Sequence, residues 1–550
     1  MHRVGLMVRR LLVRCVATAA VLCTGAVQAG AGVLPDRVLL VPLDDRPAAW
    51  QFAQMIGDIA DVQVDTPPIE MLGHFTYPGR ADDIIQWLDE HLGEYDGAIL
   101  STDMLAFGGL IASRTDRSSQ RLAEMRLQRL SQVLRKHRGT RTYAFSTLTR
   151  IAPTAVKENS KWRLHLARFV AMRTEYHTTG DRSLLPKLSN LRALIPAKEI
   201  TRYDEIRARN HAIQHRLLGM TQAKDFGFLV FGQDDAQQIG PHVSEIQRLK
   251  AAIGAMVIEG STLFASGIDQ ISNLLLSRSL MDSVQWTPDV RVVFADEQGK
   301  LKVAFYEAEP VDKSLMDQIL GSGARQSTDL SDFDYTLYVN TPDPREFALD
   351  AFLRSLQSEV DQGMPIAVAD VNLGNSGTAD SRVFEALMQG GRSSRLLAYA
   401  GWNTAGNTMG TTVPAANVYL VSRRAQVDPL HRETSLRKFI LHRLVNDYEY
   451  HRFVRPQAYS MIDSMPKASR EEAHGDDLAK VDDLVREEMS RRLRLRFDQQ
   501  LKGSKFFAGK QEYEVVGLRN VDIRLPWPRA YEVLLKFGLE IQPVHDGGGK

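Results

Sequence analysis

The stretch from Phe228 to His242, FLVFGQDDAQQIGPH, joins an apolar run to two adjacent carboxylates. The apolar half reads as a buried β-strand, and a polar segment begins at Asp234 and Asp235. In parallel α/β sheets, loops from several strands meet at the carboxyl ends of the strands, and ligands bind there. The stretch therefore predicts a parallel α/β sheet with a functional site at one edge.

The two aspartates cannot play the same part while the strand persists, because successive side chains of a strand point to opposite faces. One of Asp234 and Asp235 should face the site. The other should orient that first side chain or cap the helix expected after Gly240. The sequence leaves open which of the two is the direct participant.

Four strand and helix units precede this stretch, and such repetition indicates a parallel sheet. The strand patterns cover residues 38–43, 62–64, 97–100 and 142–145, and a further strand-like run follows at 255–258. We therefore predict an α/β domain with a parallel sheet over residues 35–284, with a barrel as the alternative to an open sheet.

A second α/β domain is predicted for residues 285–425, and a mainly helical carboxy-terminal region for residues 426–550. The expected strands of the second domain are 290–294, 301–305, 335–339, 366–369 and 396–400. The last region combines a long amphipathic helix, 470–501, with a short β segment, 513–525.

The first 29 residues have the pattern of a secretory signal peptide. Basic residues up to Arg14 precede an apolar run, Cys15 to Val27, and Val27-Gln28-Ala29 has the small residues of a cleavage site. A membrane-spanning helix needs roughly 20 apolar residues, and this run is shorter. We therefore expect an exported protein, periplasmic or secreted, without a stable membrane anchor after cleavage.

Composition excludes several functional classes. The chain has 550 residues, with 68 lysines and arginines against 67 aspartates and glutamates, so no bulk charge favours nucleic acid as a partner. Both cysteines, Cys15 and Cys23, lie in the predicted signal peptide. Disulfides, thiol nucleophiles and cysteine metal sites are therefore not expected in the mature chain. The expected partner is a small-molecule or glycan substrate.

Carboxylates follow several of the predicted strands and are the candidate catalytic groups. If they share one cleft, they can divide into an acid with a raised pKa and a base that stays ionised, as glycosidic bond hydrolysis requires. The alternative for each single aspartate is that it caps the next helix. The candidate carboxylates are Asp44, Asp45, Asp103, Asp234 and Asp235.

Three arginines near the same strand ends are candidate substrate-binding or orienting groups. Arg46 directly follows Asp44 and Asp45 and is placed to hold one of them by a bidentate pair. Arg114 and Arg150 are candidates for orienting the carboxylates or for binding an anion.

The segment Gly401 to Thr408, GWNTAGNT, has the glycine and threonine spacing of a phosphate-binding loop. Asn407 stands at the lysine position, which argues against a nucleotide. Trp402, Asn403 and Asn407 instead suggest a sugar-binding set, with the indole for stacking and the amides for hydroxyl groups. The alternative for Trp402 is a buried indole in a glycine turn.

No cofactor is predicted, although a carboxylate-bound divalent cation is left open. His211 and His215 have metal-ligand spacing on a helix, but Ala212 replaces the glutamate of a zinc-protease helix, and a packed or solvated helix face is favoured. A metal-dependent hydrolase would require three of a small set to converge on one point. The set is Asp44, Asp103, Asp234, Asp235, His74 and the His211 pair.

Five ordered motifs carry a family resemblance: LLVPLDDRP, STDMLAFGGLIASR, FGQDDAQQIG, AYAGWNTAGNTMGTT and LPWPRAYEV. In order and spacing the chain resembles the bacterial domain-of-unknown-function family 4127, from about Val38 to Leu539. The resemblance implies one continuous protein and little established chemistry. Where such sequences tend to read Gly-Ala-Asp-Glu, this chain has Gly267-Ile268-Asp269-Gln270, so we place the chemistry elsewhere.

The function that these patterns favour is an exported carbohydrate-active hydrolase, glycosidase-like in its use of carboxylates. The alternatives are a non-catalytic exported protein that binds a sugar or cell-wall fragment, and the metal-dependent hydrolase. Two carboxylates that face each other at about 5 to 9 Å across one cleft would favour the enzyme. Dispersed carboxylates with aromatic side chains would favour binding alone.

Overall fold

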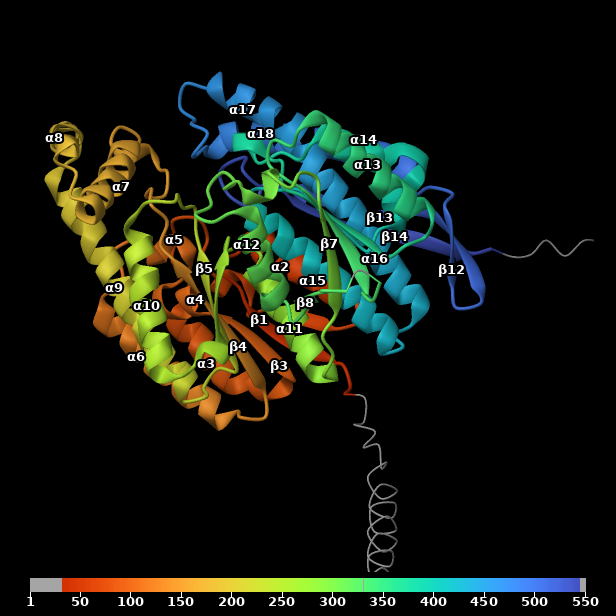
Figure 1. Cartoon of the computed structure of the whole chain (residues 1–550), viewed down its shortest axis with the longest axis horizontal. Helices are drawn as coiled ribbons and strands as arrows, with labels where there is room; N and C mark the ends of the chain where they lie inside the picture. Colours follow the sequence, from red (N-terminus) through yellow and green to blue (C-terminus); the bar gives the residue numbers. More distant parts are fainter. Residues whose placement is uncertain (1–31, 330, 545–550) are drawn as a thin grey trace, which may run out of the picture.

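The computed structural model describes residues 32–329 and 331–544. It combines two parallel α/β sheets, a helical arm and a carboxy-terminal region of helices and antiparallel strands (Figure 1). The predicted signal peptide, residues 1–29, lies outside the described residues. Among the helices described, none has both the length and the apolar character needed to cross a bilayer.

The first sheet has the order β2-β1-β3-β4-β5-β6, and every neighbouring pair is parallel. Its strands are β1 (Arg37–Val41), β2 (Gln63–Asp65), β3 (Gly97–Ser101), β4 (Arg141–Leu148), β5 (Phe228–Gln233) and β6 (Thr262–Ser266). Because β2 and β6 are free edges, the sheet is open and is not the barrel considered as an alternative. The strand order reverses between β1 and β3, where open α/β sheets bind their ligands.

Helices cover both faces of this sheet, which explains its nearly continuous apolar strands. Along β1, Val38 and Leu40 belong to one buried cluster and Leu39 and Val41 to the other, as strand alternation requires. Two helices pack on the first face, α2 (Pro47–Ile59) and α11 (Ile271–Val284). The second face is covered by α3 (Ala81–His91), α4 (Thr102–Phe107), α6 (Gln120–Lys136), α9 (Ala197–Gln222) and α10 (Pro241–Met256).

The second sheet is also parallel, with the order β11-β10-β9-β7-β8. Its strands are β7 (Asp289–Phe294), β8 (Arg325–Gln326), β9 (Tyr335–Asn340), β10 (Ile366–Asp370) and β11 (Ala398–Ala400). The helices between or after them are α12 (Val311–Gly321), α13 (Glu346–Asp361), α14 (Ser381–Met388) and α15 (Ala405–Arg424). Helix α15 is buried over most of its length and packs on α11 and α2, so one hydrophobic core runs through both sheets.

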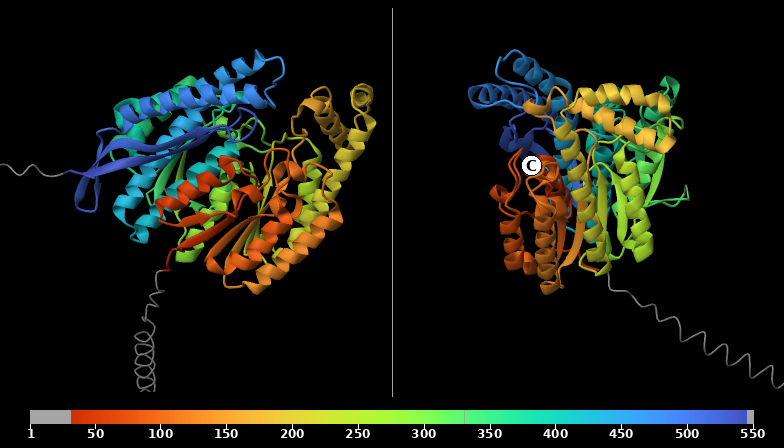
Figure 2. Two further views of the ribbon diagram at one scale, coloured as in Figure 1. Left: turned by 180° about the vertical axis from the view of Figure 1, so that it is seen from behind. Right: turned by 90° about the vertical axis from the view of Figure 1, so that its left-hand side faces the viewer.

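Two further parts stand above the first sheet. Helices α7 (Arg163–Thr179) and α8 (Leu185–Ala193) pack with the start of α9 into an arm at the left of Figure 1. The carboxy-terminal helices are α16 (Pro429–Arg443), the π-helix η9 (Leu444–Val454), α17 (Arg455–Asp463) and α18 (Gly475–Gln500). The antiparallel strands β12 (Lys505–Ala508), β13 (Gln511–Arg524) and β14 (Leu534–Pro543) follow and pack against these helices (Figure 2).

The predicted α/β class is confirmed, but two predicted strands are wrong. Residues 255–258 lie at the end of α10 and the turn after it, and the strand begins only at Thr262. Residues 301–305 contain the end of a 3-10 helix (Gly299–Leu301) and a turn, with only an isolated bridge from Val303 to Pro310. Both runs are short and apolar, a pattern that does not by itself distinguish a strand from a helix end.

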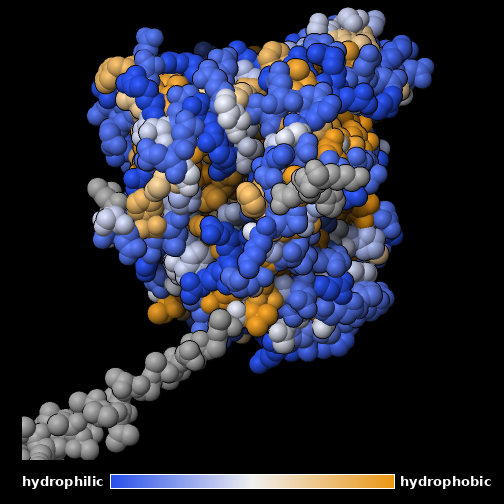
Figure 3. All heavy atoms as spheres, turned by 90° about the vertical axis from the view of Figure 1, so that its right-hand side faces the viewer, coloured by the Kyte–Doolittle hydropathy of each residue, from blue (hydrophilic) through white to orange (hydrophobic). Residues whose placement is uncertain are grey.

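The surface agrees with the balanced composition of the chain. The face in Figure 3 is mostly hydrophilic, with small apolar patches among polar side chains. The domain limits 35–284, 285–425 and 426–550 stay predictions, since the shared core joins the first two.

Candidate functional site

A cleft of about 1110 Å³ lies at the carboxyl edge of the first sheet. Its walls come from widely separated segments of the chain, including Asp234 after β5, Arg163 on α7, His451 on η9 and Trp527 between β13 and β14. The cleft therefore brings together the sheet edge, the arm and the carboxy-terminal region.

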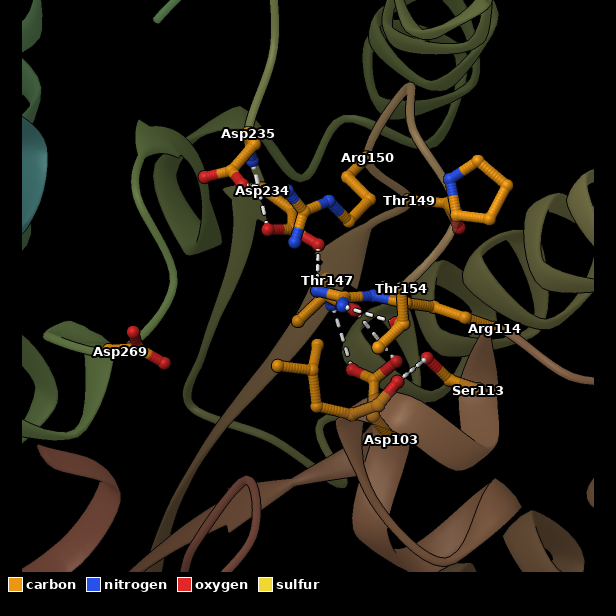
Figure 4. Close-up of polar contacts among 12 residues, drawn as sticks. Asp103, Ser113, Arg114, Thr147, Thr149, Arg150, Thr154, Asp234, Asp235 and Asp269 are labelled. Atoms are coloured by element: carbon orange, nitrogen blue, oxygen red, sulfur yellow. Dashed lines mark hydrogen bonds and ion pairs between the residues drawn. The ribbon is translucent and has the colours of Figure 1, made fainter. Parts of the chain in front are cut away.

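Asp234 is nearly buried and is held by its neighbours on the cleft floor. Its Oδ2 pairs with Arg114, and its Oδ1 accepts a hydrogen bond from the Asp235 backbone N–H at 2.9 Å (Figure 4). Arg114 also donates to the Thr154 hydroxyl at 2.9 Å. Burial raises the pKa of Asp234, but Arg114 and Arg150 outweigh burial, so the pKa is lowered and the group is ionised.

Asp235 is the more open of the two carboxylates. Its side chain is 28% exposed, against 5% for Asp234, and it pairs with Arg150. Strand β5 ends at Gln233, and the Ala236 N–H donates to the Tyr306 carbonyl at 2.8 Å, which fixes the chain beyond the strand. Loss of surrounding water raises the pKa of Asp235, with Arg150 opposing and Asp234 adding to the rise. The pKa values of the two aspartates are thus shifted in opposite directions, and their exposure differs as well.

Asp269 is a third carboxylate of the cleft, which the sequence did not single out as a site residue. It follows β6 and lines the same cleft as Asp234 and Asp235, and Figure 4 shows it apart from them on a separate loop. Its Oδ1 accepts from Arg46 at 2.8 Å, and its Oδ2 accepts from the Asn407 amide at 3.4 Å. Its charge contributes to the raised pKa of Asp235, so the two groups interact electrostatically.

Three of the five predicted carboxylates stand behind the cleft wall instead of lining it. Asp44 receives two bonds from the Arg46 fork, at 2.9 and 2.8 Å, and so supports an arginine that does line the cleft. Asp45 accepts from Trp527 Nε1 at 2.6 Å and contacts His74 Nδ1 at 2.7 Å. Their contacts hold the β1 loop beneath the carboxy-terminal region.

Asp103 lies deeper, at the end of β3, where α4 begins. Its carboxylate accepts from the Thr147 N–H at 2.8 Å and from the Thr147 hydroxyl at 2.9 Å (Figure 4). Burial raises the pKa of Asp103 to about 6, although the two Thr147 bonds oppose the rise. Asp103 therefore ties β3 to β4 under the cleft floor.

All six predicted binding residues line the cleft: Arg46, Arg114, Arg150, Trp402, Asn403 and Asn407. Trp402 exposes only 6% of its surface, because it packs on Phe52 and its indole N–H donates to the Thr411 hydroxyl at 3.3 Å. The half-exposed ring of Tyr306 offers a sugar more open surface in the same cleft.

The sequence also missed the residues that the π-helix η9 brings to the cleft. A π-helix is rare, and short π segments are frequent at functional sites. Here Asn446, His451 and Arg452 line the cleft. Burial, then Arg455 and Arg443, lower the pKa of His451, so its imidazole is neutral. No sequence signal marks this segment, because its turns follow from tertiary packing.

The other predicted polar groups lie outside the cleft. The Nε2 atoms of His211 and His215 are 3.2 Å apart on α9, and His211 Nε2 accepts a hydrogen bond from Arg248. Gln270, at the position of departure from the family pattern, is buried and donates to the Ser266 carbonyl at 2.7 Å. Within residues 32–329 and 331–544, no three His, Cys, Asp or Glu side chains gather as a metal-ligand set.

Comparison with known proteins identifies a family without assigning a reaction. A family model described as "Protein of unknown function (DUF4127)" matches residues 38–536. No curated protein matches the chain, and no solved structure matches it. Because the family model covers most of the chain, including every residue of the cleft discussed above, this protein belongs to the family DUF4127.

Proposed function

We propose that this protein is an exported carbohydrate-active hydrolase, which cleaves a glycosidic bond by carboxylate catalysis. Export rests on the signal pattern of residues 1–29. The observation that carries the catalytic proposal is the contrast among the cleft carboxylates. Asp235 has a raised pKa and is accessible, whereas Asp234 is ionised and enclosed. Such a division between carboxyl groups is the basis of acid and base assignments in glycosidases.

In this proposal Asp235 is the general acid and Asp269 the partner carboxylate. Protonated Asp235 gives its proton to the oxygen of the leaving sugar, and Asp269, in the same cleft, stabilises positive charge on the ring or activates water. Arg46 and Asn407 orient Asp269. Asp234 remains charged, holds Arg114 and fixes the backbone N–H of Asp235.

Binding without catalysis is the second candidate, and one observation favours it. Asp234, Asp235 and Asp269 each pair with an arginine, so none of them is free of a cation before substrate arrives. A metal-dependent hydrolase gains no support, because the required three-residue convergence is not found in the described part of the chain.

The test measures hydrolysis and binding separately on the purified mature protein with a panel of glycans. We expect Asp235→Asn and Asp269→Asn to lower turnover by about 10² to 10⁴ while leaving glycan binding within a few fold. Asp83→Asn, on the outer surface of α3, is the matched control and should keep full activity. Retained turnover in both cleft variants would sink the catalytic assignment, and binding without turnover in the unaltered protein would favour the binding role.

A further inference from the structure

The cleft is far more cationic than the chain as a whole. Nine of its lining residues are arginines and four are aspartates or glutamates, so positive charges exceed negative charges by five. The whole chain, in contrast, has a formal net charge of +1. The positive excess of the cleft is therefore larger than that of the whole chain, and it is concentrated in one concave site, where a field of one sign is strongest.

Five of these arginines are paired with carboxylates. Arg46, Arg114 and Arg150 hold the aspartates described above, Arg470 pairs with Asp463, and Arg529 pairs with Glu532 at 3.0 Å. These arginines already have a partner of opposite charge, which explains their presence without a ligand.

The other four arginines have no carboxylate within ion-pair distance in the described residues. Arg163 and Arg168 lie on α7, whereas Arg452 is in η9 and Arg455 begins α17. Figure 1 shows α7 and α17 in separate parts of the molecule above the first sheet, so two structural units supply the unpaired charges. We call these four residues the arginine rim.

Two residues of the arginine rim, Arg168 and Arg452, are exposed, and the other two are half-buried. Arg163 is half-buried and reaches only the Pro153 carbonyl, at 3.4 Å, and Arg455 donates to the Ser376 carbonyl. Burial lowers the pKa of Arg163, and the positive charge of the nearby Arg150 adds to the lowering, as repulsion between like charges does. An oxyanion would relieve that repulsion, and the guanidinium fork matches carboxylate and sulfate oxygens.

We propose that the cleft recognises an acidic glycan and that the arginine rim binds its carboxylate or sulfate groups. The rim lies in the same cleft as Asp235 and Asp269, so an anionic sugar on the rim would place a neighbouring glycosidic bond over the floor. The position of the bond that is cut rests on the proposed function, whereas the charge of the ligand rests on the rim alone.

The test is calorimetric binding to the full mature chain with three probes: oligogalacturonides, heparin-derived oligosaccharides and cello-oligosaccharides. At least one acidic probe should bind at least about tenfold more tightly than the neutral probe, and the difference should shrink as salt is raised. The galacturonide and heparin arms distinguish a carboxylate from a sulfate ligand.

Two variants on separate elements test the rim, Arg163→Gln with Arg168→Gln, and Arg452→Gln with Arg455→Gln. Each pair should weaken acidic binding by at least about tenfold, because several charge-assisted hydrogen bonds are lost. Arg192→Gln on α8, an exposed arginine outside the cleft, is the matched control and should change nothing. Circular dichroism checks that each double variant is folded. If one double variant does not fold, the acidic binding of the other tests the arginine rim.

Equal affinity for acidic and neutral probes, no binding of either acidic probe, or full acidic binding in the rim variants would overturn the inference. The proposed function fails in a different way. An acidic probe that binds through the rim but is never cut would remove the hydrolase proposal and leave this inference standing. If a neutral glycan is cut and the acidic probes do not bind, the hydrolase proposal stands and the inference of an acidic ligand falls.

Discussion

Asp103 is a buried carboxyl group whose stability contribution should depend on pH. Burial raises its pKa to about 6, above the usual value near 3.9. A carboxyl with a raised pKa binds more protons in the folded state, so the unfolding free energy falls as pH rises between these two values. The loss across that interval is about 3 kcal/mol for this group.

Asp103→Asn should remove this dependence while keeping both contacts with Thr147. The amide oxygen can accept from the Thr147 N–H, and the amide nitrogen can donate to the hydroxyl. Denaturant unfolding at pH 4, 5, 6 and 7 should show a smaller decrease for the variant than for the unaltered protein. Asp83→Asn, at the surface, should keep the original slope, and an equal slope in Asp103→Asn would contradict the prediction.

The buried pair of Arg443 and Asp447 supports the loop that carries Trp402. Both side chains are inaccessible, Arg443 lies 3.8 Å from the Phe52 ring centroid, and Asp447 accepts from the Gly401 N–H at 2.9 Å. Removing one partner leaves a buried charge alone, which costs about 3 to 5 kcal/mol. Arg443→Met should therefore lower the unfolding free energy by that amount.

The double variant Arg443→Met with Asp447→Leu should be less destabilised than Arg443→Met, since neither charge remains. Urea unfolding of both variants and of Asp447→Leu measures the coupling. A double variant that is as unstable as the sum of the single variants would contradict a dominant role for the charges.

At the residue level, all three arginines that the sequence proposed line the cleft, although six further arginines were missed, whereas only two of the five proposed carboxylates line it. Arginines reach several ångströms beyond their backbone, so a position near a strand end was enough for Arg46, Arg114 and Arg150. Short aspartate side chains depend on backbone direction, and Arg46 and Thr147 turn Asp44 and Asp103 away from the cleft. Asp269 was passed over because its neighbour Gln270 departs from the family pattern, and because the preceding strand was expected several residues too early.

The connection between β13 and β14 closes one side of the cleft and depends on one indole. Trp527 is 2% exposed, donates to Asp45 and lies under Arg46, whose guanidinium is 5.0 Å from the ring centroid. Trp527→Phe keeps an aromatic ring but leaves a partly buried carboxylate oxygen of Asp45 without its donor, a cost of about 1 kcal/mol.

The expected result of Trp527→Phe is faster hydrogen exchange in residues 525–533 with little change in the first sheet. Trp286→Phe, which alters an indole between α11 and β7 and outside the cleft, should leave exchange in 525–533 unchanged. Unaltered exchange there in Trp527→Phe would show that packing, and not the hydrogen bond, holds the connection.

At the level of elements, the sequence predicted those strands and helices that are determined by a local pattern of apolar residues. Strands β1, β3, β4 and β5 alternate between two buried faces, and their apolar runs were recognised. The π-helix η9 was not recognised, because the sequence predicted only a mainly helical region there and π-helices are rare. The predicted helix 470–501 was close, and the structure gives Gly475–Gln500.

The whole molecule is organised by a cleft whose walls lie nearly 500 residues apart in the chain, from Arg46 to Val533. Loops of the first sheet, the arm, the second sheet and the carboxy-terminal region each contribute to it. Sequence motifs mark the strand ends and the Trp402 loop but not the walls supplied by η9 and the arm. The meeting of the walls follows from the shared core through α15 and from the contact of Asp45 with Trp527. The sequence could therefore predict the parts of the site and not their assembly.

A ligand that fills this cleft should stabilise several parts of the molecule together. At a concentration one hundred times its dissociation constant, a ligand specific for the folded state adds about 2.7 kcal/mol to the unfolding free energy. The ligand for this test is whichever acidic probe, galacturonide or heparin oligosaccharide, binds more tightly. With it bound, hydrogen exchange should slow in all three of α7, η9 and residues 525–533. In the Arg163→Gln, Arg168→Gln variant, a tenfold weaker affinity should reduce this stabilisation to about 1.4 kcal/mol at the same ligand concentration, and the protection should fall in all three segments. Protection confined to one of the three segments would mean that the ligand binds to one wall and does not bridge the cleft.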